Sequence, residues 1–245
     1  MRIVVAIAAL GFAMPAVARA SDAPLRLSVP TQATQGPDPM PRIAAPADAA
    51  QARVNAALAG LEAAARTSWA SCRAEGGQNA EWQRHVATPM RGPRFLSVVV
   101  TDDVYCGGPH PNVSMQAVVY DLRTGQPVDW TTLLPPALVG TPTLERGADE
   151  VRTVRIGSKA LSALFLSGYS HEQADAECRR YVTENLQGLD QAGFSVWPDA
   201  ASHALVLQRN LPHVMQACDD AVAVPAATLQ HAGVRGVLMD AITGQ

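Results

Sequence analysis

The chain has 245 residues, of which 19 are Lys or Arg and 22 are Asp or Glu, so its formal net charge is −3 at pH 7. A mildly acidic chain gives no electrostatic basis for nucleic-acid binding, which depends on clustered basic residues. The length and the 48% of hydrophobic residues fit one domain with a sizeable core.

Residues 1–20 are typical of a secretory signal peptide. An apolar run covers residues 3–17, and residues 18–20 (Ala-Arg-Ala) have the small-x-small pattern that precedes cleavage. The run is shorter than the roughly 20 residues that a membrane-spanning helix needs. We therefore expect cleavage after Ala20 and a periplasmic or secreted protein. No later segment is apolar for long enough to predict a transmembrane helix in the mature chain.

Residues 21–46 contain six of the 18 prolines, which predicts an extended, proline-rich leader. Residues 26–29 could add an edge strand. The next segment, residues 47–73, is the clearest helix, because apolar residues recur every three or four positions. Gly76 and Gly77 end it. The stripe consists of Val54, Leu58, Leu61, Ala65, Trp69 and Cys72.

A β-rich block follows, with alternating apolar and polar residues that predict consecutive antiparallel strands in a meander. A hairpin-type turn falls at residues 123–126. The predicted strands cover residues 82–88, 95–105, 113–120 and 127–130.

The last third mixes both kinds of element. A short turn or helix is expected at residues 131–138, and helices at residues 151–166 and 172–187. Strands are expected at residues 194–197, 203–208 and 221–224, and a short helix begins at Pro225. Together these elements predict one α+β domain over residues 47–245, a mainly antiparallel sheet with helices packed on it.

Four cysteines in an exported chain predict two disulfides. Three connectivities are possible, and proximity along the chain favours Cys72–Cys106 and Cys178–Cys218. No CxxC motif or closely spaced cysteine pair indicates redox chemistry or a Cys-ligated zinc site.

The most distinctive stretch lies between the second and third predicted strands. Two glycines, Gly107 and Gly108, stand beside Pro109 and Pro111, which predicts a sharp, rigid turn. Gly125 has a similar turn role in the hairpin that follows. These five residues are therefore predicted to be structural.

The same stretch resembles the signature of the RsiV/PdaC-like extracytoplasmic domain family, and the resemblance extends over roughly residues 50–235. In RsiV this module binds lysozyme, and in PdaC it accompanies a separate peptidoglycan deacetylase domain, for which this chain has no room. The resemblance implies a secreted, non-catalytic binding module whose partner is a lysozyme-like muramidase or peptidoglycan. The matching residues are Gly107-Gly108-x-His110-Pro111-Asn112, Tyr120-Asp121, Thr124-Gly125 and Leu133-Leu134.

His110 is the main candidate binding residue, because two prolines hold it rigidly. Asn112, Tyr105 and Asp121 are the other candidates. The alternative for His110 is structural, a side chain that hydrogen-bonds the turn backbone.

An enzyme is the competing class, either a metal-assisted cell-wall hydrolase or a deacetylase-related activity centred on His110. Asp121 with His171 or His213 could complete a metal set, but no HExxH spacing is present. No GxSxG or SxxK motif indicates a nucleophile. We therefore expect no catalytic residue, no metal and no cofactor. A structural or assembly role is the third possibility.

Overall fold

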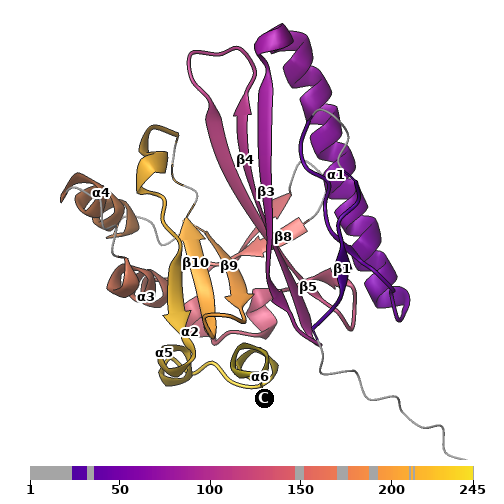
Figure 1. The fold of residues 1–245 in the computed structure, drawn as a ribbon. Coiled ribbons are helices and arrows are strands. Elements are labelled where there is room, and N and C mark those ends of the chain that lie inside the picture. Colours follow the sequence, from indigo (N-terminus) through magenta and orange to yellow (C-terminus); the bar gives the residue numbers. More distant parts are fainter. Residues whose placement is uncertain are drawn as a thin grey trace, which may run out of the picture.

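The computed structural model describes residues 24–31, 36–146, 152–169, 176–187, 193–209, 211 and 213–244. The predicted signal peptide lies outside these ranges. A long helix, α1, lies along one side of a four-stranded sheet, and a three-stranded sheet and short helices form the rest of the molecule (Figure 1). Among the described residues, no helix combines the length and hydropathy needed to cross a membrane.

The helices are α1 (Ala49–Gly76), α2 (Pro136–Val139), α3 (Lys159–Gly168), α4 (Ala176–Gln187), α5 (Ala226–His231) and α6 (Val237–Thr243). The longer strands are β3 (Glu81–Arg91), β4 (Phe95–Tyr105), β5 (Asn112–Asp121), β9 (Phe194–Asp199), β10 (Ala204–Arg209) and β11 (Val222–Pro225). The short strands are β1 (Leu27–Ser28), β2 (Arg42–Ile43), β6 (Gln126–Pro127), β7 (Thr143–Arg146) and β8 (Arg152–Arg155). Three 3₁₀ turns cover Gly77–Asn79, Trp130–Thr132 and His213–Cys218.

Every strand pair is antiparallel, which confirms the predicted α+β class. The meander β3-β4-β5-β6 forms one sheet, and β11-β10-β9 forms a second. The two sheets are joined by hydrogen bonds from the buried Ser97 hydroxyl to the Pro198 carbonyl (3.0 Å) and from the Ala200 amide to the Pro89 carbonyl (3.1 Å).

Two apolar clusters form the core. One lies between α1 and the near face of the meander and includes Leu58, Val98, Val118 and Tyr120. The other lies between the far face of the meander, the second sheet and the short helices. Since side chains alternate along a strand, β4 and β5 contribute to both clusters.

Helix α1 begins at Asp48, whose side chain accepts a hydrogen bond from the Gln51 amide (2.8 Å). Its buried stripe includes five of the six apolar positions that were predicted: Val54, Leu58, Leu61, Ala65 and Cys72. The sixth, Trp69, is half-buried.

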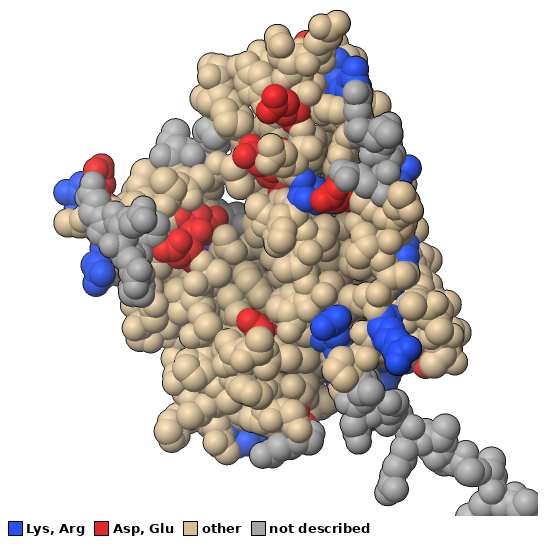
Figure 2. Space-filling view, viewed as in Figure 1, with Lys and Arg blue, Asp and Glu red and all other residues tan. Residues whose placement is uncertain are grey.

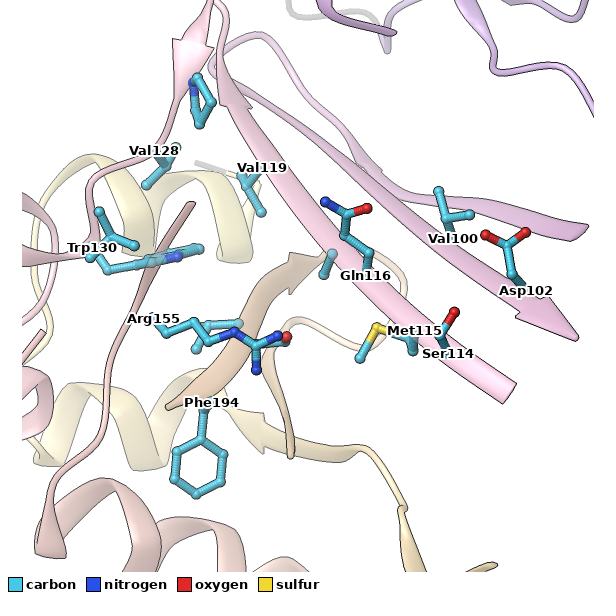
Figure 3. A pocket seen from close by; sticks show the side chains of 15 residues that line it. Val100, Asp102, Ser114, Met115, Gln116, Val119, Val128, Trp130, Arg155 and Phe194 are labelled. Carbon is cyan, nitrogen blue, oxygen red and sulfur yellow. The ribbon is translucent and has the colours of Figure 1, made fainter. Parts of the chain in front are cut away.

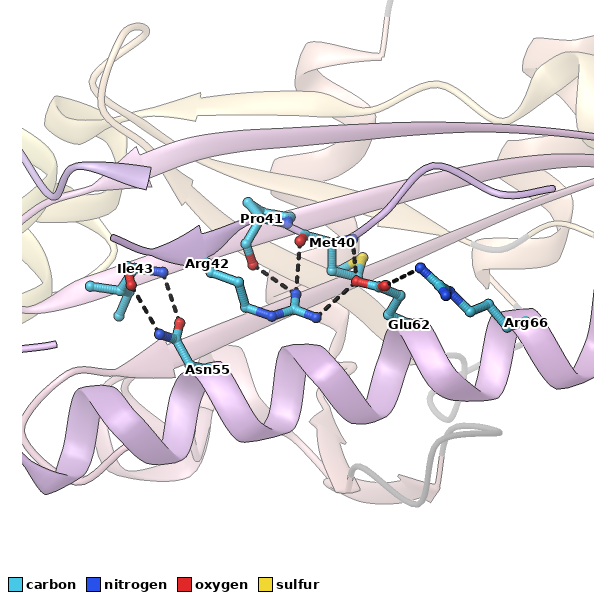
Figure 4. A network of polar contacts seen from close by, with 7 residues as sticks. All are labelled: Met40, Pro41, Arg42, Ile43, Asn55, Glu62 and Arg66. Carbon is cyan, nitrogen blue, oxygen red and sulfur yellow. Dashed lines mark hydrogen bonds and ion pairs between the residues drawn. The ribbon is translucent and has the colours of Figure 1, made fainter. Parts of the chain in front are cut away.

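Residues 40–43 of the leader are hydrogen-bonded to side chains of α1 (Figure 4). Asn55 accepts a hydrogen bond from the Ile43 amide (2.7 Å) and donates one to the Ile43 carbonyl (2.9 Å), as a neighbouring strand would. Glu62 accepts from the Met40 amide (3.1 Å) and from Arg42 (2.8 Å). Met40 and Ile43 are buried, so this part of the leader belongs to the packed fold.

Asn55→Ala should destabilise the protein by about 1–3 kcal/mol, because it leaves both backbone groups of the buried Ile43 without their partner. Urea denaturation would measure the change. Arg66→Ala is the control, because it removes only a surface pair with Glu62 and should change stability by less than about 1 kcal/mol. Equal effects of the two substitutions would contradict this role of Asn55.

The helix predicted over residues 151–166 is wrong in its first part. Residues 152–155 form β8, which pairs with β7, a strand that we did not predict. The helix starts later, at Lys159, where the Ser158 hydroxyl accepts a hydrogen bond from the Leu161 amide (3.0 Å). Ser158 therefore marks the true start of the helix, and the apolar Val154 before it belongs to strand β8.

Candidate functional site

A cleft of about 780 Å³ separates the C-terminal half of α1 from the meander. The helix side is lined by the polar residues Thr67, Ser68 and Ser71 together with apolar ones such as Ala64 and Ala65. The sheet side carries Trp82 and Arg84 of β3, Val100, Asp102 and Val104 of β4, and Asn112, Ser114 and Gln116 of β5. This volume is in the range of small-molecule sites.

The cleft exists because one sheet face changes character along its length. Even-numbered residues of β4 and β5 face α1. Near the start of α1 these are apolar and buried, as for Val98 and Val118. Near the end of α1 they are mixed, because the polar Asp102, Ser114 and Gln116 lie beside Val100 and Val104. The apolar surface available to the end of the helix is therefore interrupted by polar side chains.

The base of the cleft holds a fixed charge pair. The Arg84 guanidinium makes two 2.7 Å hydrogen bonds to the Asp102 carboxylate, and the Trp82 indole N–H donates a third at 2.7 Å. The guanidinium carbon also lies 5.9 Å from the centroid of Trp82. Bidentate geometry of this kind fixes both side chains, so they form a rigid base rather than mobile charges.

The Cys72–Cys106 disulfide closes one end of the cleft and confirms one predicted pair. It ties the last turns of α1 to the residue that follows β4. Close to it, a Cβ on Gly107 would lie 3.1 Å from the Gly76 Cα, and Gly107 has a φ of 89°. The turn therefore needs glycine at position 107 for both space and backbone conformation.

Gly107→Val should destabilise the protein by about 1–3 kcal/mol, because valine cannot readily adopt that φ. Gly108→Ala is a matched control from the same turn, since its Cβ would meet only the His110 carbonyl oxygen at 4.0 Å. Thermal unfolding of the two variants would check this. Wild-type stability of Gly107→Val would show that the glycine is dispensable.

The structure brings together two of the four predicted binding residues. His110 and Asn112 both line the cleft, at its disulfide end. The His110 ring lies 3.3 Å from the Pro111 carbonyl, which fits a donating Nδ1–H and supports the structural alternative. Tyr105 instead lines a small hollow with Glu81, Gln83, Asp103 and Pro111, residues that are absent from the lining of the cleft.

Asp121 lies at the other end of β5, about 30 Å from Asn112 by strand length. Its carboxylate pairs with Arg94 (2.6 Å) and accepts a hydrogen bond from the Arg123 amide (2.9 Å), so it organises the hairpin. Gly125 in that hairpin has a φ of 70°, and a Cβ there would lie 2.3 Å from the Ala50 carbonyl oxygen. Asp121 therefore organises the hairpin, and Gly125 lets the hairpin approach the start of α1 closely.

The described residues contain no group of three or more His, Cys, Asp and Glu side chains placed to hold a metal ion. His110 and Asp121 stand at opposite ends of β5, so they cannot share an ion. His171 and the side chain of His213 lie outside the described residues.

Sequence reasoning missed most of the lining. Arg84, Ser114 and Gln116 were predicted only as residues of strands. One signal was present: polar residues occupy alternate, same-face positions at the ends of three adjacent strands. That signal has meaning only once the helix facing those strands is known.

A second polar cluster lies beside the other disulfide, Cys178–Cys218, which confirms the second predicted pair. Burial raises the pKa of Asp219 to about 6, although hydrogen bonds from Leu211 and Gln208 oppose the shift. Burial also lowers the pKa of Arg209. Asp219 Oδ1 and Arg209 Nη1 are buried and have no hydrogen-bond partner among the described residues.

Because the folded-state pKa of Asp219 exceeds the unfolded value of about 3.9, its ionisation opposes folding. Stability from the protonated form is complete below about pH 4 and is lost as pH rises through 6. The free energy of unfolding of Asp219→Asn minus that of the wild type should therefore be larger at pH 8 than at pH 4, as measured by urea unfolding at both pH values. The exposed Asp103→Asn is the charge-matched control. A stability difference that does not change with pH would contradict the assignment.

Figure 2 shows that charged side chains on this face are separated by wide uncharged areas, without a continuous basic patch. The cleft lining is similarly close to neutral. Arg84 and Asp102 compensate each other, and Glu75 is the only other carboxylate among the described residues of the lining.

Comparison with known proteins gives a limited result. No protein-family model matches the sequence. No curated protein matches it either. A solved DUF3298 family protein from Pseudomonas aeruginosa PAO1 aligns with a TM-score of 0.47 and 10% identity, over 89% of this chain and 97% of that chain. A DUF3298 family member from Bacteroides fragilis NCTC 9343 aligns with a TM-score of 0.39 and 10% identity, over 78% and 68% respectively. Likeness at this level carries no functional argument.

Proposed function

We propose that the protein is a secreted or periplasmic, non-catalytic binding module, and that the cleft between α1 and the meander binds glycan strands of peptidoglycan. The observation that carries the proposal is the lining of the cleft. Among the polar side chains of its described lining, neutral hydroxyl and amide groups outnumber charged ones; they come from Thr67, Ser68 and Ser71 on one side and Asn112, Ser114 and Gln116 on the other.

This lining suits an N-acetylated sugar chain. Sugar hydroxyls and acetamido groups need both donors and acceptors, and hydroxyl and carboxamide side chains supply both. Trp82 adds an apolar ring to the same surface. A polyanion is less suitable, because Arg84, the one Arg among the described lining residues, is already paired with Asp102.

The same lining favours binding over hydrolysis. Glycoside hydrolysis ordinarily requires two carboxyl groups that flank the scissile bond and can exchange protons. Asp102 is held by Arg84 and by the Trp82 indole, and Glu75 is the other carboxylate among the described residues of the lining. The resemblance to the RsiV/PdaC-like family also supports a cell-envelope role.

A muramidase is the second candidate partner, and one observation favours it. Residues 107–112 are exposed along their whole length and are braced by the disulfide at Cys106. A rigid, protruding loop of this kind can dock into another protein with little loss of conformational entropy.

Calorimetric titration of the mature chain with N-acetylchitotetraose tests the glycan proposal. We expect saturable binding, and Ser114→Tyr should weaken it at least about tenfold because the new ring would fill the cleft. Val113→Tyr is the matched control, since the Val113 side chain is exposed and is not part of the cleft lining. It should bind like the wild type.

The same preparation should be titrated with a c-type lysozyme while lysis is followed. Lysozyme binding without chitotetraose binding would replace the glycan proposal by the muramidase one. Binding of neither would overturn both. Equal loss of chitotetraose binding in the two tyrosine variants would remove the cleft as the site.

A further inference from the structure

A second cavity, of about 230 Å³, continues from the cleft around the free edge of β5. Both cavities are lined by Val100, Asp102, Ser114 and Gln116. In Figure 3, Asp102 and Ser114 lie at one end of the second cavity and Val128 and Trp130 at the other. The second cavity is therefore open to a substituent of a molecule that occupies the cleft.

The free edge of β5 turns backbone groups toward the second cavity. Strand β4 pairs with β5 along its length, whereas β6 pairs only with the last residues of β5. On the side away from β4, the Val119 carbonyl accepts a hydrogen bond from the Val128 amide. Since the direction of backbone groups alternates along an antiparallel strand, the N–H and C=O groups of Met115 and Ala117 lie on this same side.

These edge groups are available to a ligand. Within the part of the chain that the structure describes, no hydrogen bond reaches the N–H or C=O groups of Met115 and Ala117 from that side. Both residues are half-buried and line the second cavity. Backbone groups in such a place need a partner, which water or a ligand must supply. Donors and acceptors alternate along the edge, so they match the paired N–H and C=O of an amide.

Much of the remaining lining is apolar. The apolar part includes Val119, Val128, Trp130 and Phe194, all of them buried. Arg155 is also part of the wall, where its guanidinium makes contacts within the protein, including one from Nη1 to the Gly193 carbonyl (3.4 Å). An apolar wall beside an amide-binding strand edge suits a small amide that carries a methyl group.

We infer that the second cavity recognises the acetamido group of a sugar bound in the cleft. The N–H of this group donates to a carbonyl of the β5 edge at Met115 or Ala117, its carbonyl accepts from an N–H of the same edge, and its methyl group packs on the apolar wall. The cavity is smaller than the roughly 300–1,000 Å³ of a site for a whole drug-sized ligand, so it fits one substituent of a larger molecule.

The acetamido group is then the specificity determinant, and the ligand is an N-acetylated glycan rather than any neutral glycan of the same backbone. A deacetylated strand would lose the amide carbonyl and the methyl group together. This inference rests on the proposed function, because the cleft must bind the sugars.

Calorimetric titration of the wild-type mature chain with N-acetylchitotetraose and with cellotetraose tests the inference without a mutation. Cellotetraose has the same linkage and carries a hydroxyl in place of each acetamido group. We expect N-acetylchitotetraose to bind at least about tenfold more tightly, because a hydroxyl cannot make the paired hydrogen bonds of an amide. Equal affinities would overturn the inference and leave the proposed function intact. Binding of neither sugar would overturn the proposed function itself.

Ala117→Leu tests the assignment to this cavity, because the larger side chain would fill space in a lining that is not part of the cleft. The ratio of the two affinities should fall from at least about tenfold to near one. Met115→Trp changes the same wall and should have the same result. Ala87→Leu is the matched control, since Ala87 is also half-buried on a strand of this sheet and belongs to neither lining. It should keep the wild-type ratio.

An N-acetyl preference that survives both Ala117→Leu and Met115→Trp would overturn the assignment to the second cavity. An equal loss of the preference in Ala87→Leu would also overturn it, because that side chain does not reach the cavity.

Discussion

The Cys72–Cys106 disulfide is the constraint on which the cleft depends. Helix α1 has 28 residues and spans about 42 Å. Its first half is held by apolar packing through Leu58 and its neighbours. Its second half lines the cleft and packs through Ala65, Cys72 and an edge contact between Trp69 and Trp82. A covalent bond that closes a loop of 34 residues stabilises a fold by about 3–4 kcal/mol, and here it also fixes the free end of the helix.

Because that end is fixed, the polar groups of the cleft are organised before any ligand arrives. The Arg84–Asp102 pair and the Trp82 hydrogen bond make the base rigid, and Gly107 allows the turn to approach Gly76 closely. A preorganised surface loses less conformational entropy on binding than a mobile one. A cleft held open at its end by a disulfide is therefore better suited to recognition than a gap left by imperfect packing.

The elements that the sequence predicted well are those whose signal is local. Strand β4 matches its predicted residues 95–105, and α1 differs by a few residues at each end, because alternation and helical periodicity are strong there. Both disulfides follow from proximity along the chain. The pairing of β7 with β8 was missed because β8 is short: Arg152–Arg155 has four residues and lies shortly before the helix cap at Ser158. Strand pairing also depends on a distant partner and is therefore not a local property.

The site was less predictable for a related reason. His110 and Asn112 drew attention through their turn, and both line the cleft. Tyr105 has the opposite parity from Asp102 on the same strand, so alternation alone separates it from the cleft.

The placement of β5 explains how one strand can serve two cavities. Its even-numbered side chains form a wall of the cleft, its odd-numbered side chains face the second sheet, and its edge between Val113 and Val119 is not covered by β6. An uncovered edge ordinarily invites pairing with other chains. Here β8 and β9 approach it and enclose a small cavity instead. The polar backbone of β5 is thereby shielded from a further strand, so the short length of β6 does not leave an open sheet edge.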